Sequence, residues 1–68
     1  MNPVKLTKRE AEILGYLAQG VTSKEIAATL FLSKRTVDFH LANIYAKLSV
    51  KNRLQAFHAA TSRGLMSF

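Results

Sequence analysis

One short stretch of this 68-residue chain carries Lys34, Arg35, Asp38 and Asn43, whose side chains form hydrogen bonds. The two cations donate hydrogen bonds, the carboxylate accepts them, and the amide does both. Such a set can read the edges of nucleotide bases, because Arg pairs with guanine, Asn with adenine and Asp with cytosine. The chemistry that these residues suggest is recognition rather than bond cleavage.

Catalytic arrangements are missing from the sequence. It has no cysteine, no HExxH pattern and no paired carboxylates suited to acid–base work. We expect His40 and His58 to serve in packing, with His58 also suited to a dimer face. Gly15, Gly20 and Gly64 are too scattered to form a phosphate-binding loop. We therefore expect no enzyme activity, no catalytic residue, no metal site and no cofactor.

The composition indicates one small basic domain over residues 1–68, with residues 1–5 as a short lead. Ten Lys and Arg stand against four Asp and Glu, which gives a formal net charge of +6. A charge of this size favours polyanionic partners, although it also serves solubility. No apolar run reaches the roughly 18 residues of a membrane span, and no signal peptide is visible, so we expect a cytoplasmic protein that does not bind membranes.

Two capped helices must precede the polar stretch. Thr7 and Glu10 form a capping box, and Gly20 supplies the stop, which predicts a helix over residues 8–19. Thr22 and Glu25 repeat the device and predict a helix over residues 23–30. These helices bury apolar residues at helical spacing, namely Ile13, Leu14, Leu17, Ile26, Ala27 and Leu30. Leu32 is the expected core residue of the following turn.

A third helix, over residues 34–48 with Ser33 as its cap, must carry the polar stretch. Its core stripe consists of Val37, Leu41, Ile44 and Leu48, and the opposite side carries Arg35, Phe39, Ala42 and Ala46. Two alanines on that side allow the backbone to approach a surface closely. The helix-turn-helix formed with the preceding helix therefore indicates entry into the major groove of DNA, and the alternative is a merely solvated face.

A fourth helix is expected from Asn52 or Arg53 to Ser62 or Arg63, before Gly64. One side carries Leu54, Phe57, His58 and Thr61, and another carries the small residues Ala56 and Ala60. We predict that one side packs on the core and the other meets a second copy, with deeper burial as the alternative. An apolar tail of Leu65, Met66 and Phe68 follows.

Taken together, the residues from Leu6 to Leu65 resemble the LuxR/GerE family of bacterial DNA-binding domains, also found at the C-terminus of NarL and FixJ type response regulators. The resemblance rests on residue types at fixed spacing: Leu6-Thr7-Lys8-Arg9-Glu10, Gly20, Lys24-Glu25-Ile26-Ala27, Ser33, Thr36-Val37, His40-Leu41, Asn43-Ile44, Lys47-Leu48, Val50, Asn52-Arg53, Ala56, Ala60 and Gly64-Leu65.

This resemblance implies an all-α, four-helix regulator whose third helix enters the major groove and whose fourth helix forms a dimer. At matching positions it implies phosphate contacts from Lys24, Ser33, Thr36 and Arg53, and base contacts from Arg35, Asp38, Phe39, Ala42 and Asn43. Lys34 and Lys47 complete the predicted DNA-binding set. The predicted dimer interface consists of Leu54, Ala56, Phe57, His58 and Ala60.

Two residues depart from the family pattern. Asp38 stands where many members have lysine, and a carboxylate cannot pair with phosphate. It either accepts from cytosine N4 or pairs with Lys34 or Arg35 and orients them, and we favour pairing. Ser23 replaces a frequent asparagine. Glu10, besides capping, is expected to pair with a basic residue such as Arg53.

We interpret the chain as a free-standing, GerE-like transcription factor that dimerises on double-stranded DNA in the bacterial nucleoid, with RNA polymerase as a further partner. An excised C-terminal domain of a larger regulator is the alternative. Two other functions stay open. One is a sigma region four-like domain, because its opening is similar. The other is a protein-interaction module that pairs through the fourth helix with regulators or RNA polymerase.

Overall fold

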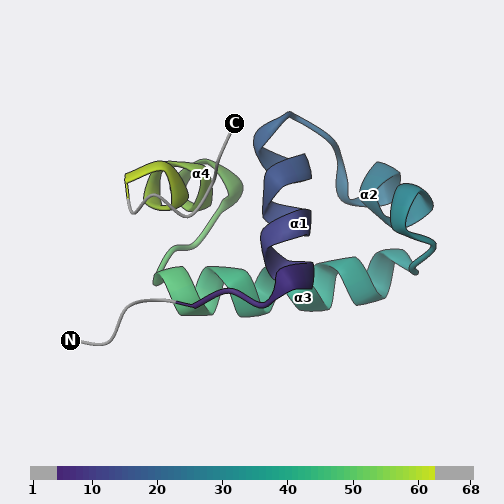
Figure 1. Ribbon diagram of the computed structural model, residues 1–68, viewed down its shortest axis with the longest axis horizontal. Coiled ribbons are helices and arrows are strands. Elements are labelled where there is room, and N and C mark those ends of the chain that lie inside the picture. Colours follow the sequence, from purple (N-terminus) through teal and green to yellow (C-terminus); the bar gives the residue numbers. More distant parts are fainter. Residues whose placement is uncertain (1–4, 63–68) are drawn as a thin grey trace.

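The computed structural model describes residues 5–62, which form four helices and no strand (Figure 1). These are α1 (Lys8–Ala18), α2 (Ser23–Leu30), α3 (Lys34–Leu48) and α4 (Arg53–Ser62). The predicted all-α class is confirmed, and α1 ends one residue earlier than predicted. The predicted stop at Gly64 and the apolar tail after it lie outside the described residues.

Capping side chains fix where the helices begin. The Thr7 hydroxyl oxygen accepts the Glu10 N–H at 3.1 Å, and Glu10 Oε1 accepts the Thr7 N–H at 2.9 Å. Thr22 and Glu25 make the same reciprocal pair at the start of α2, so both predicted capping boxes are confirmed. Ser33 Oγ accepts the backbone N–H three residues on, at 3.0 Å, and so caps α3 as predicted.

Left-handed residues follow three of the helices. Gly20 has φ 88°, as expected of a glycine stop, but Phe31 and Ser49 also adopt positive φ, at 58° and 57°. A side chain in this conformation costs about 1–2 kcal/mol, because Cβ crowds the following carbonyl. No glycine marks these two helix ends in the sequence, so the core packing on either side must hold both turns.

Helix α3 is the platform on which the other helices pack. Figure 1 shows α1 crossing its middle, α2 over its N-terminal end and α4 near its C-terminal end, all on one side of α3. The buried hydrophobic residues between them are Ile13, Leu14, Leu17, Ile26, Ala27, Val37, Leu41, Ile44, Leu48, Ala56 and Ala60. Leu30 and Leu32 pack against this core but are only half-buried. The other side of α3 is left without a covering helix in the described part of the chain.

The residues that α4 buries against the core differ from the prediction. Ala56 and Ala60 are fully buried, with 0% exposure, whereas Leu54 is 64% exposed. Small side chains let α4 approach the core closely, which is why the alanines lie inside. Placing Ala56 and Ala60 in a dimer interface was therefore wrong, since a second copy cannot reach them in this fold.

Candidate nucleic-acid interface

The outward face of α3 is open over its whole length. Arg35, Phe39, Ala42 and Ala46 are all exposed, and Phe39 keeps 63% of its surface. On the opposite side Val37 and Ile44 are completely buried. The predicted division of this helix into a core stripe and an outward face is therefore confirmed.

The N-terminus of α3 is positively charged. Its first turn has no acidic residue, unlike the first turns of α1 and α2, and it carries the exposed cations Lys34 and Arg35. The positive end of the helix dipole adds to these charges, so this end attracts anions. The Ser33 hydroxyl donates to Thr36 Oγ1 at 2.9 Å, which leaves the Thr36 hydroxyl proton able to donate elsewhere.

Asp38 forms the pair with Lys34 that the sequence favoured. Lys34 Nζ lies 2.8 Å from Asp38 Oδ2, and the two side chains are 63% and 47% exposed. The hydrogen bond from Lys34 lowers the pKa of Asp38 below its ordinary value, and the Ser23 side chain on α2 lowers it further. The carboxylate is thus ionised and engaged at neutral pH.

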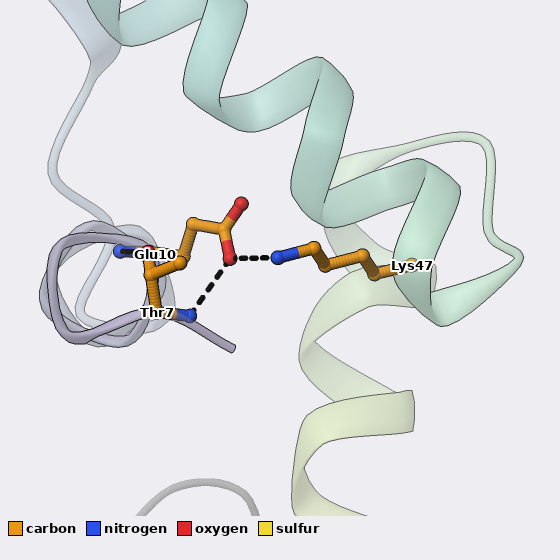
Figure 2. Close-up of polar contacts among 3 residues, drawn as sticks. All are labelled: Thr7, Glu10 and Lys47. Atoms are coloured by element: carbon orange, nitrogen blue, oxygen red, sulfur yellow. Dashed lines mark hydrogen bonds and ion pairs between the residues drawn. The ribbon is translucent and has the colours of Figure 1, made fainter. Parts of the chain in front are cut away.

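Lys47 lies in an internal ion pair (Figure 2). Its Nζ is 2.6 Å from Oε1 of Glu10, a residue that is only 4% exposed. Burial alone raises the pKa of Glu10, but the hydrogen bond from Lys47, the Thr7 N–H and the charge of Lys47 outweigh it, so the pKa is lowered. The prediction that Glu10 pairs with a basic residue is confirmed, but that residue is Lys47 rather than Arg53, because α1 crosses α3 with Glu10 next to Lys47.

Arg53 is also engaged inside the fold. Its Nη2 donates to the carbonyl oxygen of Leu17 at 2.7 Å, and the side chain is half-buried. Leu17 lies in the last turn of α1, where carbonyls lack partners within the helix. The Leu17 carbonyl also accepts the Gly20 N–H at 3.1 Å, so Arg53 and the glycine turn share this acceptor. No local sequence pattern names Arg53 as the partner. Lys47 and Arg53 thus each use one N–H donor inside the fold, and each keeps further N–H donors.

The remaining predicted residues lie on the surface or near it. Lys24 is exposed at the start of α2, Asn43 is half-buried on α3 one turn after Phe39, and His40 is half-buried with its ring centroid 6.0 Å from that of Phe39. Phe31, which no sequence pattern singled out, is 95% exposed in the turn before α3. Its unusual backbone conformation leaves no pattern that a sequence would reveal.

A shallow groove of about 330 Å³ runs between the end of α1 and α4. Its lining is mainly apolar and consists of Leu17, Ala18, Gly20, Arg53, Leu54 and Phe57. His58, predicted to pack or to join a dimer, is exposed on α4. Leu54, Phe57 and His58 are therefore the predicted dimer residues that a partner can reach.

Other kinds of site find no support in residues 5–62. The described part of the chain holds no group of three or more His, Cys, Asp or Glu side chains placed to bind a metal ion. No helix within it has both the length and the apolar character needed to cross a membrane.

Comparison with known proteins places these features in context. A family model described as "GerE: Bacterial regulatory proteins, luxR family" matches residues 4–60. The spore germination protein GerE of Bacillus subtilis is 53% identical over 51 residues, which are 75% of this chain and 69% of that protein. The CsgBAC operon transcriptional regulatory protein of Escherichia coli is also 53% identical over 51 residues, but they are 24% of its length. The chain thus spans about a quarter of several relatives.

Solved structures share the fold. The response regulator ChrA of a heme-sensing two-component system superposes with a TM-score of 0.90 at 44% identity, over 97% of this chain and 33% of that one. The VqmA chain of a VqmA–ligand–DNA complex from Vibrio cholera superposes with a TM-score of 0.88 at 31% identity, over 100% of this chain and 30% of that one.

Proposed function

We propose that this chain, which belongs to the luxR family of bacterial regulatory proteins, binds double-stranded DNA as a transcriptional regulator and lays α3 in the major groove. The observation that carries the proposal is the outward face of α3, which is uncovered in the described residues and begins at a positively charged helix end. A membrane or an acidic protein would also attract the positively charged end of α3. Neither of these partners, however, requires a helix with one side that no other helix covers.

The outward face suits a groove in shape as well as in charge. The major groove is about 12 Å wide and admits an α-helix with its side chains. Ala42 and Ala46 keep the exposed face thin, so the backbone can sit deep. Arg35, Phe39 and Asn43 then lie four residues apart along one row, with a guanidinium for guanine, a ring for a thymine methyl and an amide for adenine.

Phosphate contacts come from the edges of this surface. Lys24 and Thr36 lie at the first turns of α2 and α3, where helix N-termini favour anions. Ser33 acts through Thr36, because its one hydroxyl proton is donated to Thr36 Oγ1. Lys47 and Arg53 stay in the proposed contact set but rank below Lys24 and Thr36, because each already donates within the fold, to Glu10 and to the Leu17 carbonyl. The net charge of +6 supports long-range attraction to DNA.

A dimer built on α4 would place two copies of α3 on one duplex. Leu54 is 64% exposed and lines the apolar groove with Phe57, so burying both against a second copy removes apolar surface from water. A two-fold dimer then predicts half-sites about one helical turn, or a multiple of it, apart. Leu54→Glu should abolish self-association in sedimentation, and a dimer that persists would exclude this face.

We further propose that the regulator works in the bacterial cytoplasm with RNA polymerase as a partner. The alternative, a module that binds proteins through α4 without DNA, rests on the exposed Leu54 and on the apolar groove that it lines with Phe57. A gel-shift titration separates the two. Wild type should bind duplex DNA with an affinity that falls steeply with salt, by a log–log slope of about −0.9 for each neutralised phosphate. Weak, salt-independent binding would favour the protein-interaction module.

Arg35→Ala tests the groove contact within that titration. Loss of a bidentate base contact costs about 1–3 kcal/mol, so affinity for a selected site should fall about 5- to 150-fold. Arg9→Ala is the matched control, because it removes a partly exposed guanidinium from α1 that pairs with Glu12. Equal affinities for the two variants would remove Arg35 from the interface.

A further inference from the structure

Asp38 lies on a flank of α3 rather than at the centre of its outward face. At about 100° per residue, it stands about 100° from buried Val37 on one side and about 100° from exposed Phe39 on the other. Lys34, four residues earlier, lies about 40° from it on the same flank. The Ser23 side chain on α2 helps to lower the pKa of Asp38, and α2 packs against α3.

This position matters because the flanks of a helix in the major groove face the phosphates that border the groove, and its centre faces the bases. A free carboxylate on a flank would repel those phosphates. In the structure it is instead bound to the Lys34 ammonium at 2.8 Å, so the pair as a whole is neutral. Lys34, the first residue of α3, would otherwise be well placed to bind a phosphate, since it is 63% exposed.

We infer that Asp38 is a positioning residue that reads no base and that lowers the affinity for DNA of every sequence by holding Lys34 away from the phosphates. This inference rests on the proposed DNA binding through α3. It differs from the expectation that Asp38 accepts from cytosine, which requires the carboxylate to reach a base edge. It also predicts an unusual direction of change, because a variant should bind DNA more tightly than the wild type.

The test uses Asp38→Asn, which keeps the shape of the side chain and removes its charge. Sites are selected from random duplexes with wild type and variant, and affinities are measured on a selected and an unselected duplex. Asp38→Asn should bind both more tightly and select the same sequence. If Lys34 gains one phosphate contact, the advantage over wild type should fall about 3.5-fold between about 50 and 200 mM salt.

Two further variants separate this mechanism from others. Glu12→Gln also removes one negative charge, from an exposed side chain on α1 that pairs with Arg9. The Glu12 and Asp38 side chains are equally exposed, at 47%. It should leave affinity nearly unchanged. Asp38→Glu keeps a carboxylate four residues from Lys34 and should restore wild-type affinity and salt dependence.

Three results would overturn the inference. The first is weaker binding of Asp38→Asn with a changed preference at one base pair, which would assign base reading to Asp38. The second is an equal gain for Glu12→Gln, which would reduce the effect to net charge. The third is a failure of Asp38→Glu to behave as wild type. If the wild type itself shows no salt-dependent binding to duplex DNA, the proposed function fails as well, so the two failures are distinguishable.

Discussion

Replacing Lys47 with Met removes the ammonium that faces the buried carboxylate of Glu10 and keeps a similar unbranched stem. The perturbation leaves Glu10 with the Thr7 N–H as its remaining partner among the described residues. The side chain of Glu10 is 5% exposed, so water cannot easily replace the lost charge. We expect Lys47→Met to lower the free energy of unfolding without changing the order of the helices.

The size of the effect follows from the burial of the two partners. Removing one partner of a fully buried ion pair costs about 3–5 kcal/mol, and a hydrogen bond to a charged group contributes about 1.5–3 kcal/mol. Because the Lys47 side chain is 38% exposed, water screens the pair and the lower range applies. A loss of about 2 kcal/mol should lower Tm by about 8–16 °C in a domain of this size.

A double-mutant cycle with Glu10→Gln isolates the pair. The Gln side chain keeps an oxygen for the Thr7 N–H and carries no charge, so Lys47→Met in that background leaves no buried ion. Urea unfolding followed by far-ultraviolet circular dichroism at neutral pH gives the four free energies. The double variant should be more stable than the sum of the single losses predicts, by about 1 kcal/mol or more.

The exposed pair Arg9–Glu12 is the control for this cycle. Its side chains are 42% and 47% exposed, so Arg9→Met should change stability by no more than about 0.5 kcal/mol. A cost for Lys47→Met as small as that for Arg9→Met would contradict this prediction, and so would strict additivity of the substitutions at Glu10 and Lys47.

Three other outcomes can be measured on the same protein. Folding lowers the pKa of Glu10 below its ordinary value of 4.5. The stability that ionised Glu10 contributes is therefore complete above pH 4.5 and is lost as the pH falls through the lower folded pKa. The difference in unfolding free energy between wild type and Glu10→Gln should shrink in acid, and a difference independent of pH would contradict this. Gly15→Ala should stabilise by about 0.5–1 kcal/mol, because an added Cβ meets nothing within 4 Å, whereas Gly20→Ala should destabilise because φ is +88°; thermal unfolding gives both signs. Ser49→Gly should raise Tm by relieving a positive φ, and a lower Tm would show that the Ser49 side chain is needed.

The helices could be predicted from the sequence because their signals are local. Capping residues stand within three positions of their partners, and buried stripes repeat within one helix. Lys34–Asp38 was within reach for the same reason, since the two residues are one helical turn apart. These features need no knowledge of how the helices cross.

The partners of Glu10 and Arg53 depend on helix crossing and could not be read in this way. Lys47 and Leu17 are 37 and 36 residues from them along the chain. The sides of α4 posed a similar difficulty, because both carry apolar residues and the periodicity does not choose between them. Only packing against α1 and α3 shows that Ala56 and Ala60 face the core.

Binding of duplex DNA by the outward face of α3 is the central claim, and an NMR titration tests it most directly. Backbone amide shifts of isotope-labelled protein would be followed as a selected duplex is added. We predict that the largest changes cluster from Ser33 to Ala46 and at the start of α2. Changes confined to α4, or none at all under low-salt conditions, would contradict the account.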